Sequence, residues 1–94
     1  SIFYSYFAAL GLDVKVEDAT NHGRIDMSVK FNKNIYLFEF KVVEISPDGR
    51  AIAQLKSKNY ADKYRADGLP INLIGVEFSK TERNIVGFEV ETLL

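Results

Sequence analysis

The sequence predicts an α/β fold in which a central mixed sheet is flanked by helices. Its 94 residues are enough for one hydrophobic core, so we expect a single domain over 1–94. A hydrophobic fraction of 47% is ample for that core and excludes a disordered chain. Apolar residues recur at helical spacing in some segments, and alternate or run continuously, as in strands, in others. The order of these segments is αβββαββ.

The first segment, 1–10, has helical periodicity and precedes Gly11, a residue that favours helix ends. We interpret its apolar stripe as part of the core. The stripe consists of Ile2, Phe3, Tyr6, Phe7 and Leu10. Because the sequence starts within this helix, we expect the chain to be a C-terminal fragment of a longer protein.

Three strands joined by short turns follow, which favours an antiparallel meander. Residues 12–18 alternate loosely, residues 24–31 alternate clearly, and residues 35–43 are apolar almost throughout. The last pattern is typical of a strand covered on both faces, so it predicts the centre of the sheet.

A second helix is predicted over 50–65, with small residues and tyrosines on the side that faces the sheet. That side consists of Ala53, Ser57, Tyr60, Ala61 and Tyr64. Two strands follow, over 71–78 and 84–90. A helix between the third and fourth strands favours a parallel crossover. We expect the last strand to lie near an edge, where two copies of the chain could pair; the oligomeric state stays open.

Composition excludes several kinds of site. The sequence contains no cysteine, which rules out disulfides and thiolate metal sites. Its one histidine, His22, leaves little scope for a zinc site or a Ser-His-Asp triad. The net charge of −1 provides no bulk basicity for nucleic acid. Apolar runs are too short for a membrane span and no signal peptide is recognisable, so we expect a cytoplasmic protein without membrane contact.

The most informative feature is a pair of charges inside an apolar strand. Glu39 and Lys41 are two residues apart, so their side chains project from the same face. Burying such charges is costly unless they are paired or bind a ligand. A salt bridge between them on a solvated face is the simpler alternative.

Asp26 is the expected neighbour of this pair. With Lys33 at the centre of the turn 32–34, Met27 would lie opposite Glu39, and Asp26 within one residue of that position. Two adjacent carboxylates repel each other unless a divalent cation lies between them, and oxygen ligands suit Mg²⁺ or Mn²⁺. Asp26 could instead be a solvated acid near a turn.

The residues Gly23-Arg24-Ile25-Asp26, then Glu39-Phe40-Lys41, then a helix containing Gln54, resemble the PD-(D/E)XK nuclease superfamily. More narrowly, they resemble the bacterial nuclease domain at the C-terminus of proteins with an AAA-ATPase-like N-terminal region. The resemblance covers essentially the whole chain, including 59–64 and 74–78. It implies a restriction-endonuclease-like core.

The resemblance also implies roles for four residues. Asp26 and Glu39 would ligate Mg²⁺ or Mn²⁺, Lys41 would serve catalysis, and Gln54 would lie near the site. The superfamily commonly has a glutamate on its first helix, whereas 1–10 contains no acid.

The implied function is metal-dependent hydrolysis of phosphodiester bonds in DNA, with RNA as the second choice, by an activated water. An ATPase-like domain is the partner implied upstream. The alternative is a non-catalytic module of the same fold that binds nucleic acid or docks that domain. Basic residues on the predicted helix 50–65 would favour a phosphate-binding surface.

Overall fold

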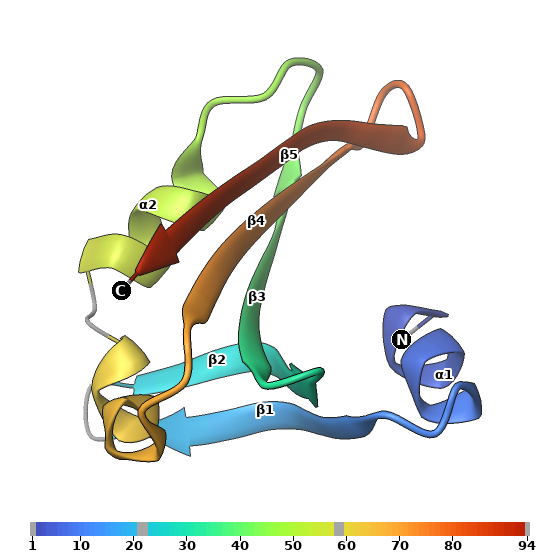
Figure 1. The fold of residues 1–94 in the computed structure, drawn as a ribbon. Helices are drawn as coiled ribbons and strands as arrows, with labels where there is room; N and C mark the ends of the chain where they lie inside the picture. The colour runs from blue at the N-terminus through green and yellow to red at the C-terminus, as the bar shows by residue number, and fades with distance from the viewer. Residues whose placement is uncertain (1, 21–22, 58–59, 94) are drawn as a thin grey trace.

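The chain folds into a five-stranded mixed sheet with helices on both faces (Figure 1). The computed structural model describes residues 2–20, 23–57 and 60–93. The elements are α1 (Ile2–Ala9), β1 (Asp13–Thr20), β2 (Gly23–Phe31), β3 (Asn34–Val43), α2 (Arg50–Ser57), the 3₁₀ helix η1 (Tyr60–Asp67), β4 (Ile71–Ser79) and β5 (Asn84–Leu93). The predicted α/β class and the order αβββαββ are confirmed.

The strands lie in the order β1-β2-β3-β4-β5, so β3 is central. Neighbouring strands are antiparallel except β3 and β4, which are parallel and joined through α2 and η1. This is the crossover expected when a helix separates two paired strands. The sheet is strongly twisted, and β1 and β2 turn away from the direction of β4 and β5 (Figure 1). β5 is an edge strand, as predicted.

The hairpin between β2 and β3 differs from the prediction by one residue. Phe31 pairs with Asn34, so the turn contains only Asn32 and Lys33, whose φ angles are 50° and 60°. Two successive positive φ angles are typical of a type I′ turn, which matches the twist of a hairpin. Met27 therefore lies opposite Phe38 and not opposite Glu39.

The predicted continuous helix over 50–65 is wrong. α2 ends at Ser57, and the chain continues as the separate 3₁₀ helix η1. α2 packs on β3 and β4, whereas η1 also contacts β1 and β2, so the two helices cover different parts of the sheet. Within the described part of the chain, none of the helices has the length and apolar character needed to cross a bilayer.

The face of α2 that contacts the sheet also differs from the prediction. Ala51 and Leu55 are buried, while Ala53 and Ser57 are exposed. Residues four apart lie above one another on a helix, so Ala51 and Leu55 form one stripe. Tyr64 of the expected side lies in the core, from η1, while the side chains of Tyr60 and Ala61 lie outside the part of the chain that the structure describes.

Each face of the sheet has its own hydrophobic cluster. Beneath α2 the cluster is made of Ile35, Leu37, Leu55, Tyr64, Ile71 and Leu73. Beneath α1 it is made of Met27, Val29, Phe38, Ile74 and Val76. The two clusters alternate along β3 and β4, since neighbouring residues of a strand point to opposite faces. Figure 1 shows the two helices on opposite sides of β3.

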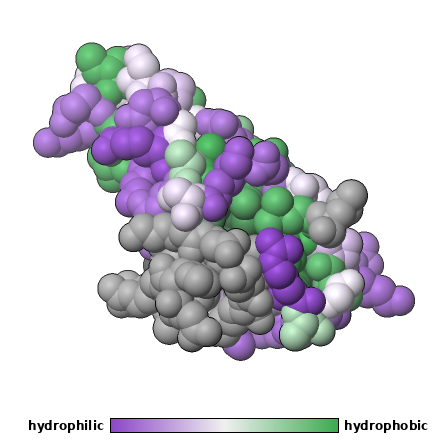
Figure 2. Space-filling model, turned by 90° about the vertical axis from the view of Figure 1, so that its left-hand side faces the viewer, coloured by the Kyte–Doolittle hydropathy of each residue, from purple (hydrophilic) through white to green (hydrophobic). Residues whose placement is uncertain are grey.

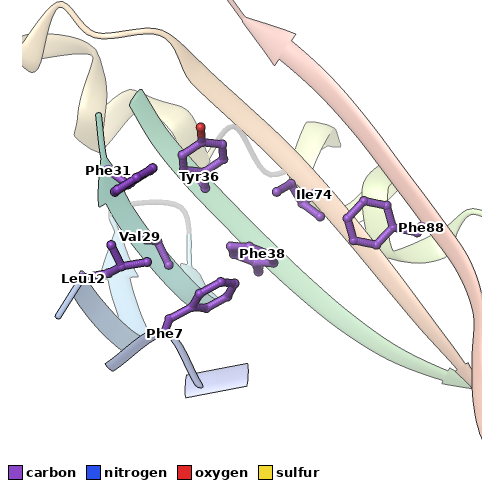
Figure 3. Close-up of a pocket in the computed structure, with 8 residues that line it drawn as sticks. All are labelled: Phe7, Leu12, Val29, Phe31, Tyr36, Phe38, Ile74 and Phe88. Carbon is purple, nitrogen blue, oxygen red and sulfur yellow. The ribbon is translucent and has the colours of Figure 1, made fainter. Parts of the chain in front are cut away.

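α1 covers only part of its face. Phe7 packs on Phe38 with ring centroids 5.8 Å apart. Tyr6 and Leu10 are 63% and 59% exposed, so the interpretation of the whole stripe as core is wrong for these two residues. Beside α1 lies a hollow of about 270 Å³ lined by apolar side chains from α1, the following loop and four strands (Figure 3). It lies on the face opposite to Glu39 and offers no charged group to a polar substrate.

Candidate metal centre

Glu39 is a carboxylate at the centre of the sheet. Its side chain points to the α2 face because Phe38 and Phe40, the residues on either side, point to the α1 face. It is only 3% exposed. The neighbouring position in β4 is Gly75, which has no side chain and lets the backbone of α2 approach closely. Glu39 therefore lies in a layer between sheet and helix.

The structure brings Asp26 to Glu39. Met27 pairs with Phe38, and one further step along this register sets Asp26 beside Glu39, on the same face. The backbone N–H of Phe40 donates to Asp26 Oδ2 at 2.8 Å. The two carboxylates therefore form a pair across neighbouring strands, as the sequence predicted despite its error of one residue in the register.

The environment of Glu39 disfavours its charge. Burial, first, and the negative charge of Asp26, second, raise the pKa of Glu39 from 4.5 to about 7, although Lys41 acts in the opposite direction. Oε1 of Glu39 is buried and has no hydrogen-bond partner among the described residues. A buried carboxylate oxygen without a partner costs about 1–3 kcal/mol, or more when charged. Such an oxygen atom can coordinate a cation.

Lys41 and Gln54 both contact the other oxygen of Glu39. Lys41 Nζ lies 3.5 Å from Oε2 and its side chain is 32% exposed, so it stands at the rim of the layer. Gln54, from α2, donates from Nε2 to the same Oε2 at 3.0 Å. These two donors hold Oε2 and leave Oε1 available. All four predicted site residues thus lie together at one place.

A second buried acid, Glu77 of β4, lies next to this group and was not predicted as part of it. Its Cα is the register partner of Lys41, and its side chain is 2% exposed. The signal was present in the sequence, because Glu77 interrupts an apolar strand just as Glu39 does. Its partners are backbone N–H groups of α2 and the loop before it, which sequence alone does not reveal.

The basic residues of α2 do not form a free cationic surface. Arg50 pairs with Asp48 at 2.7 Å, and Lys56 pairs with Glu91 at 3.3 Å. Figure 2, which views the molecule from the side of α2, shows hydrophilic residues over much of the surface that the described residues form. His22 and the side chain of Arg24 lie outside the part of the chain that the structure describes.

Among the described residues, no three His, Cys, Asp or Glu side chains gather around a common point. Within the described part of the chain, the candidate centre therefore offers the two carboxylates of Asp26 and Glu39. That number suits Mg²⁺, which commonly binds one or two carboxylates and completes its shell with water and phosphate oxygens.

Comparison with known proteins gives the family of the chain. A family described as the PD-(D/E)XK nuclease superfamily matches residues 1–88. The chain belongs to the PD-(D/E)XK nuclease superfamily. A similar protein of Azotobacter chroococcum mcd 1, named "Uncharacterized protein in vnfD 5'region", is 69% identical over 93 residues. These residues make up 99% of this superfamily member but only 18% of that relative.

Proposed function

We propose that this chain is a Mg²⁺- or Mn²⁺-dependent nuclease that hydrolyses phosphodiester bonds of DNA. The observation that supports the proposal is the carboxylate pair of Asp26 and Glu39, in which one buried oxygen of Glu39 has no hydrogen-bond partner among the described residues. Membership of a superfamily of nucleases supports the reaction class. DNA as the substrate, and Mg²⁺ or Mn²⁺ as the metal, are proposed in addition to this reaction class.

The residues present fit a hard divalent cation. The donors are carboxylate oxygens, which Mg²⁺ and Mn²⁺ prefer over nitrogen or sulfur. A positive charge between Asp26 and Glu39 would relieve the repulsion that contributes to the raised pKa of Glu39. Asp26 and Glu39 are the residues that would hold the cation. When bound, the cation acts as a Lewis acid and lowers the pKa of water, which makes the water a stronger nucleophile near neutral pH.

The chain's own residues have separate tasks. Gln54 and Lys41 hold Oε2 of Glu39 and so orient the carboxylate. Lys41 is the partly exposed member, and its ammonium stabilises the negative charge that develops on the phosphate. The hydrogen bond from Phe40 N–H holds Asp26 Oδ2 in place. Charged donors placed before the reaction lower the barrier because little reorganisation is then needed.

The test is cleavage of plasmid and single-stranded DNA by the purified chain with Mg²⁺, with Mn²⁺ and with EDTA. We expect cleavage with metal and none with EDTA. Asp26→Asn and Glu39→Gln should remove both cleavage and calorimetric Mn²⁺ binding. Lys41→Ala should lower cleavage by about 10²-fold or more while Mn²⁺ binding persists.

Two exposed residues provide matched controls. Glu44→Gln removes a carboxylate just beyond the end of β3, and Lys80→Ala removes an ammonium just beyond the end of β4. Both should cleave like the parent. Mn²⁺ binding that survives in both Asp26→Asn and Glu39→Gln would contradict the assignment. DNA binding without cleavage under either metal would favour a non-catalytic module of the nuclease fold.

A further inference from the structure

Glu77 binds the start of α2 with both of its carboxylate oxygens. Oε1 accepts from the backbone N–H groups of Asp48 at 2.8 Å and Gly49 at 3.2 Å. Oε2 accepts from the N–H of Ala51 at 3.1 Å. The first N–H groups of a helix have no partner within the helix, so an acceptor from outside must satisfy them. Here that acceptor comes from a strand 26 to 29 residues away in the sequence.

This contact is a helix cap supplied by the sheet. The carbonyl of Gly49 accepts the first helical bond, from Ala53 N–H, so Gly49 is the N-cap residue, and its φ of 77° favours glycine. Asp48 Oδ1 accepts from the N–H of Arg50, an early donor that Glu77 does not bind. The negative charge of Glu77 also lies at the positive end of the helix dipole. Both oxygens of Glu77, a side chain that is 2% exposed, thus accept hydrogen bonds.

The space around Glu77 is shaped for this arrangement. Its register partner in β5 is Gly87, and a Cβ added there would lie 3.2 Å from Glu77 Cβ and 3.0 Å from Pro47 Cβ. Two residues earlier on the same face of β4, a Cβ added to Gly75 would lie 2.5 Å from Ile52 N. β4 therefore positions α2 at two successive points, by a cap and by a close approach.

The same helix turn carries the residue that contacts the candidate centre. Ala51 provides the last N–H group that Glu77 binds, and Gln54 lies three residues later, nearly one helical turn. Its amide reaches Glu39 Oε2 only because α2 lies close to the sheet in this register. Glu77 is also occupied by backbone donors, so Lys41, its neighbour across the strands, pairs with Glu39.

We propose that Glu77 is a positioning residue of the candidate centre: it holds the first turn of α2 on β4 and thereby places the amide of Gln54 on Glu39. The inference rests on the proposed function where it concerns metal binding. The placement of Gln54 can be measured without any metal.

The first readout is the pair of side-chain amide signals of Gln54 in a ¹⁵N–¹H spectrum of the metal-free chain, assigned by their loss in Gln54→Ala. Glu77→Ala removes the acceptor that the sheet supplies to the start of α2, although Asp48 Oδ1 still accepts from Arg50 N–H, and the Gln54 signals should shift to the position of an exposed glutamine. Glu77→Gln keeps one oxygen acceptor and should give a smaller shift in the same direction. If Glu77→Ala fails to fold, the shift of the Gln54 signals in Glu77→Gln tests the proposal.

Ser79→Ala is the control for a general loss of stability. Ser79 is a buried polar residue of the same strand, but it binds Glu44 O and Glu82 N, away from α2. The Gln54 signals should not move in this variant. Gln54 signals that stay in place in folded Glu77→Gln and Glu77→Ala would overturn the proposal, as would an equal shift in Ser79→Ala.

The second readout is calorimetric Mn²⁺ binding, which concerns the proposed function. We expect about 10-fold weaker binding in Glu77→Ala, as for other residues that orient a metal ligand. The double variant Glu77→Ala/Gln54→Ala should bind no more weakly than Gln54→Ala, because Glu77 acts through Gln54. Additive losses would overturn this route of action. A parent chain that binds no Mn²⁺ would contradict the proposed function, and the amide signals would still decide the role of Glu77.

Discussion

Asp26 Oδ2 accepts a hydrogen bond of 2.8 Å from the backbone N–H of Phe40, the residue that follows Glu39. The contact joins β2 to β3 beyond the last regular pair of their ladder, Met27 with Phe38. It therefore holds the two strands together at the place where their carboxylates meet. The same acid that repels Glu39 electrostatically keeps Glu39's strand in register.

This double role predicts a stability difference between two variants of Asp26. Asp26→Ala removes the carboxylate acceptor of this hydrogen bond and should lower the free energy of unfolding by about 1–2 kcal/mol. Asp26→Asn keeps an acceptor oxygen and should lose less than half as much. Urea unfolding at pH 5 is the measurement, since Glu39 is then largely uncharged and repulsion contributes little. Equal stabilities of the two variants would show that the hydrogen bond contributes nothing.

The raised pKa of Glu39 predicts that the metal-free protein loses stability as pH rises. Between the unfolded value of 4.5 and the folded value of about 7, the folded state binds more protons than the unfolded state. The contribution of Glu39 to stability is therefore fully present below this window and falls through it, by about 2–3 kcal/mol between pH 5 and pH 8. Asp48, whose pKa is lowered mainly by the hydrogen bond from Arg50 N–H, stays ionised throughout the window.

Urea unfolding in EDTA across this range is the test of that slope. Glu39→Gln cannot ionise and should remove most of the loss, whereas Glu44→Gln, an exposed control, should follow the parent. Added Mn²⁺ should restore stability to the parent at pH 8 but not to Glu39→Gln. A slope that is the same in the parent and in Glu39→Gln would assign the pH dependence to other groups.

Two glycines of the sheet predict a graded series of alanine substitutions. In Gly75→Ala, the added Cβ meets the backbone of Ile52 at 2.5 Å, so α2 must move as a whole. We expect a loss of about 2–3 kcal/mol and loss of the Gln54 contact. In Gly87→Ala, the nearest atoms are the Cβ atoms of Pro47 and Glu77 at 3.0 Å and 3.2 Å, a smaller overlap that small shifts can relieve, so the loss should be about 1 kcal/mol. Thermal unfolding of both variants checks the order, and the reverse order would contradict the packing of α2 on Gly75.

The turn between β2 and β3 predicts a stabilising substitution. Lys33 has a φ of 60°, which costs an L-residue free energy that glycine avoids. Lys33→Gly creates the Asn-Gly pair that type I′ turns prefer, and it should raise the free energy of unfolding by about 0.5–1 kcal/mol. Lys33→Ala removes the same charged side chain without relieving the backbone and serves as the control. A gain in both variants would point to the lysine charge and not to the backbone.

Strand periodicity and short connections predict the five strands and the charged pair on β3. Strand alternation puts Glu39 and Lys41 on one face because successive side chains of a strand point to opposite sides. A helix between two strands implied their parallel pairing, which the structure has between β3 and β4. These features depend on periodicity and on short connections, which can be read along the chain.

The hairpin register, the division of the second helix and the role of Glu77 depend on contacts between distant parts of the chain, which periodicity does not predict. The hairpin register depended on whether the turn has two or three residues, and only the paired strands show that it has two, Asn32 and Lys33. The division of the predicted long helix into α2 and η1 follows from packing on different strands. The role of Glu77 could not be predicted from its position in an apolar strand. The donors that satisfy its buried carboxylate come from the start of α2, a distant part of the chain.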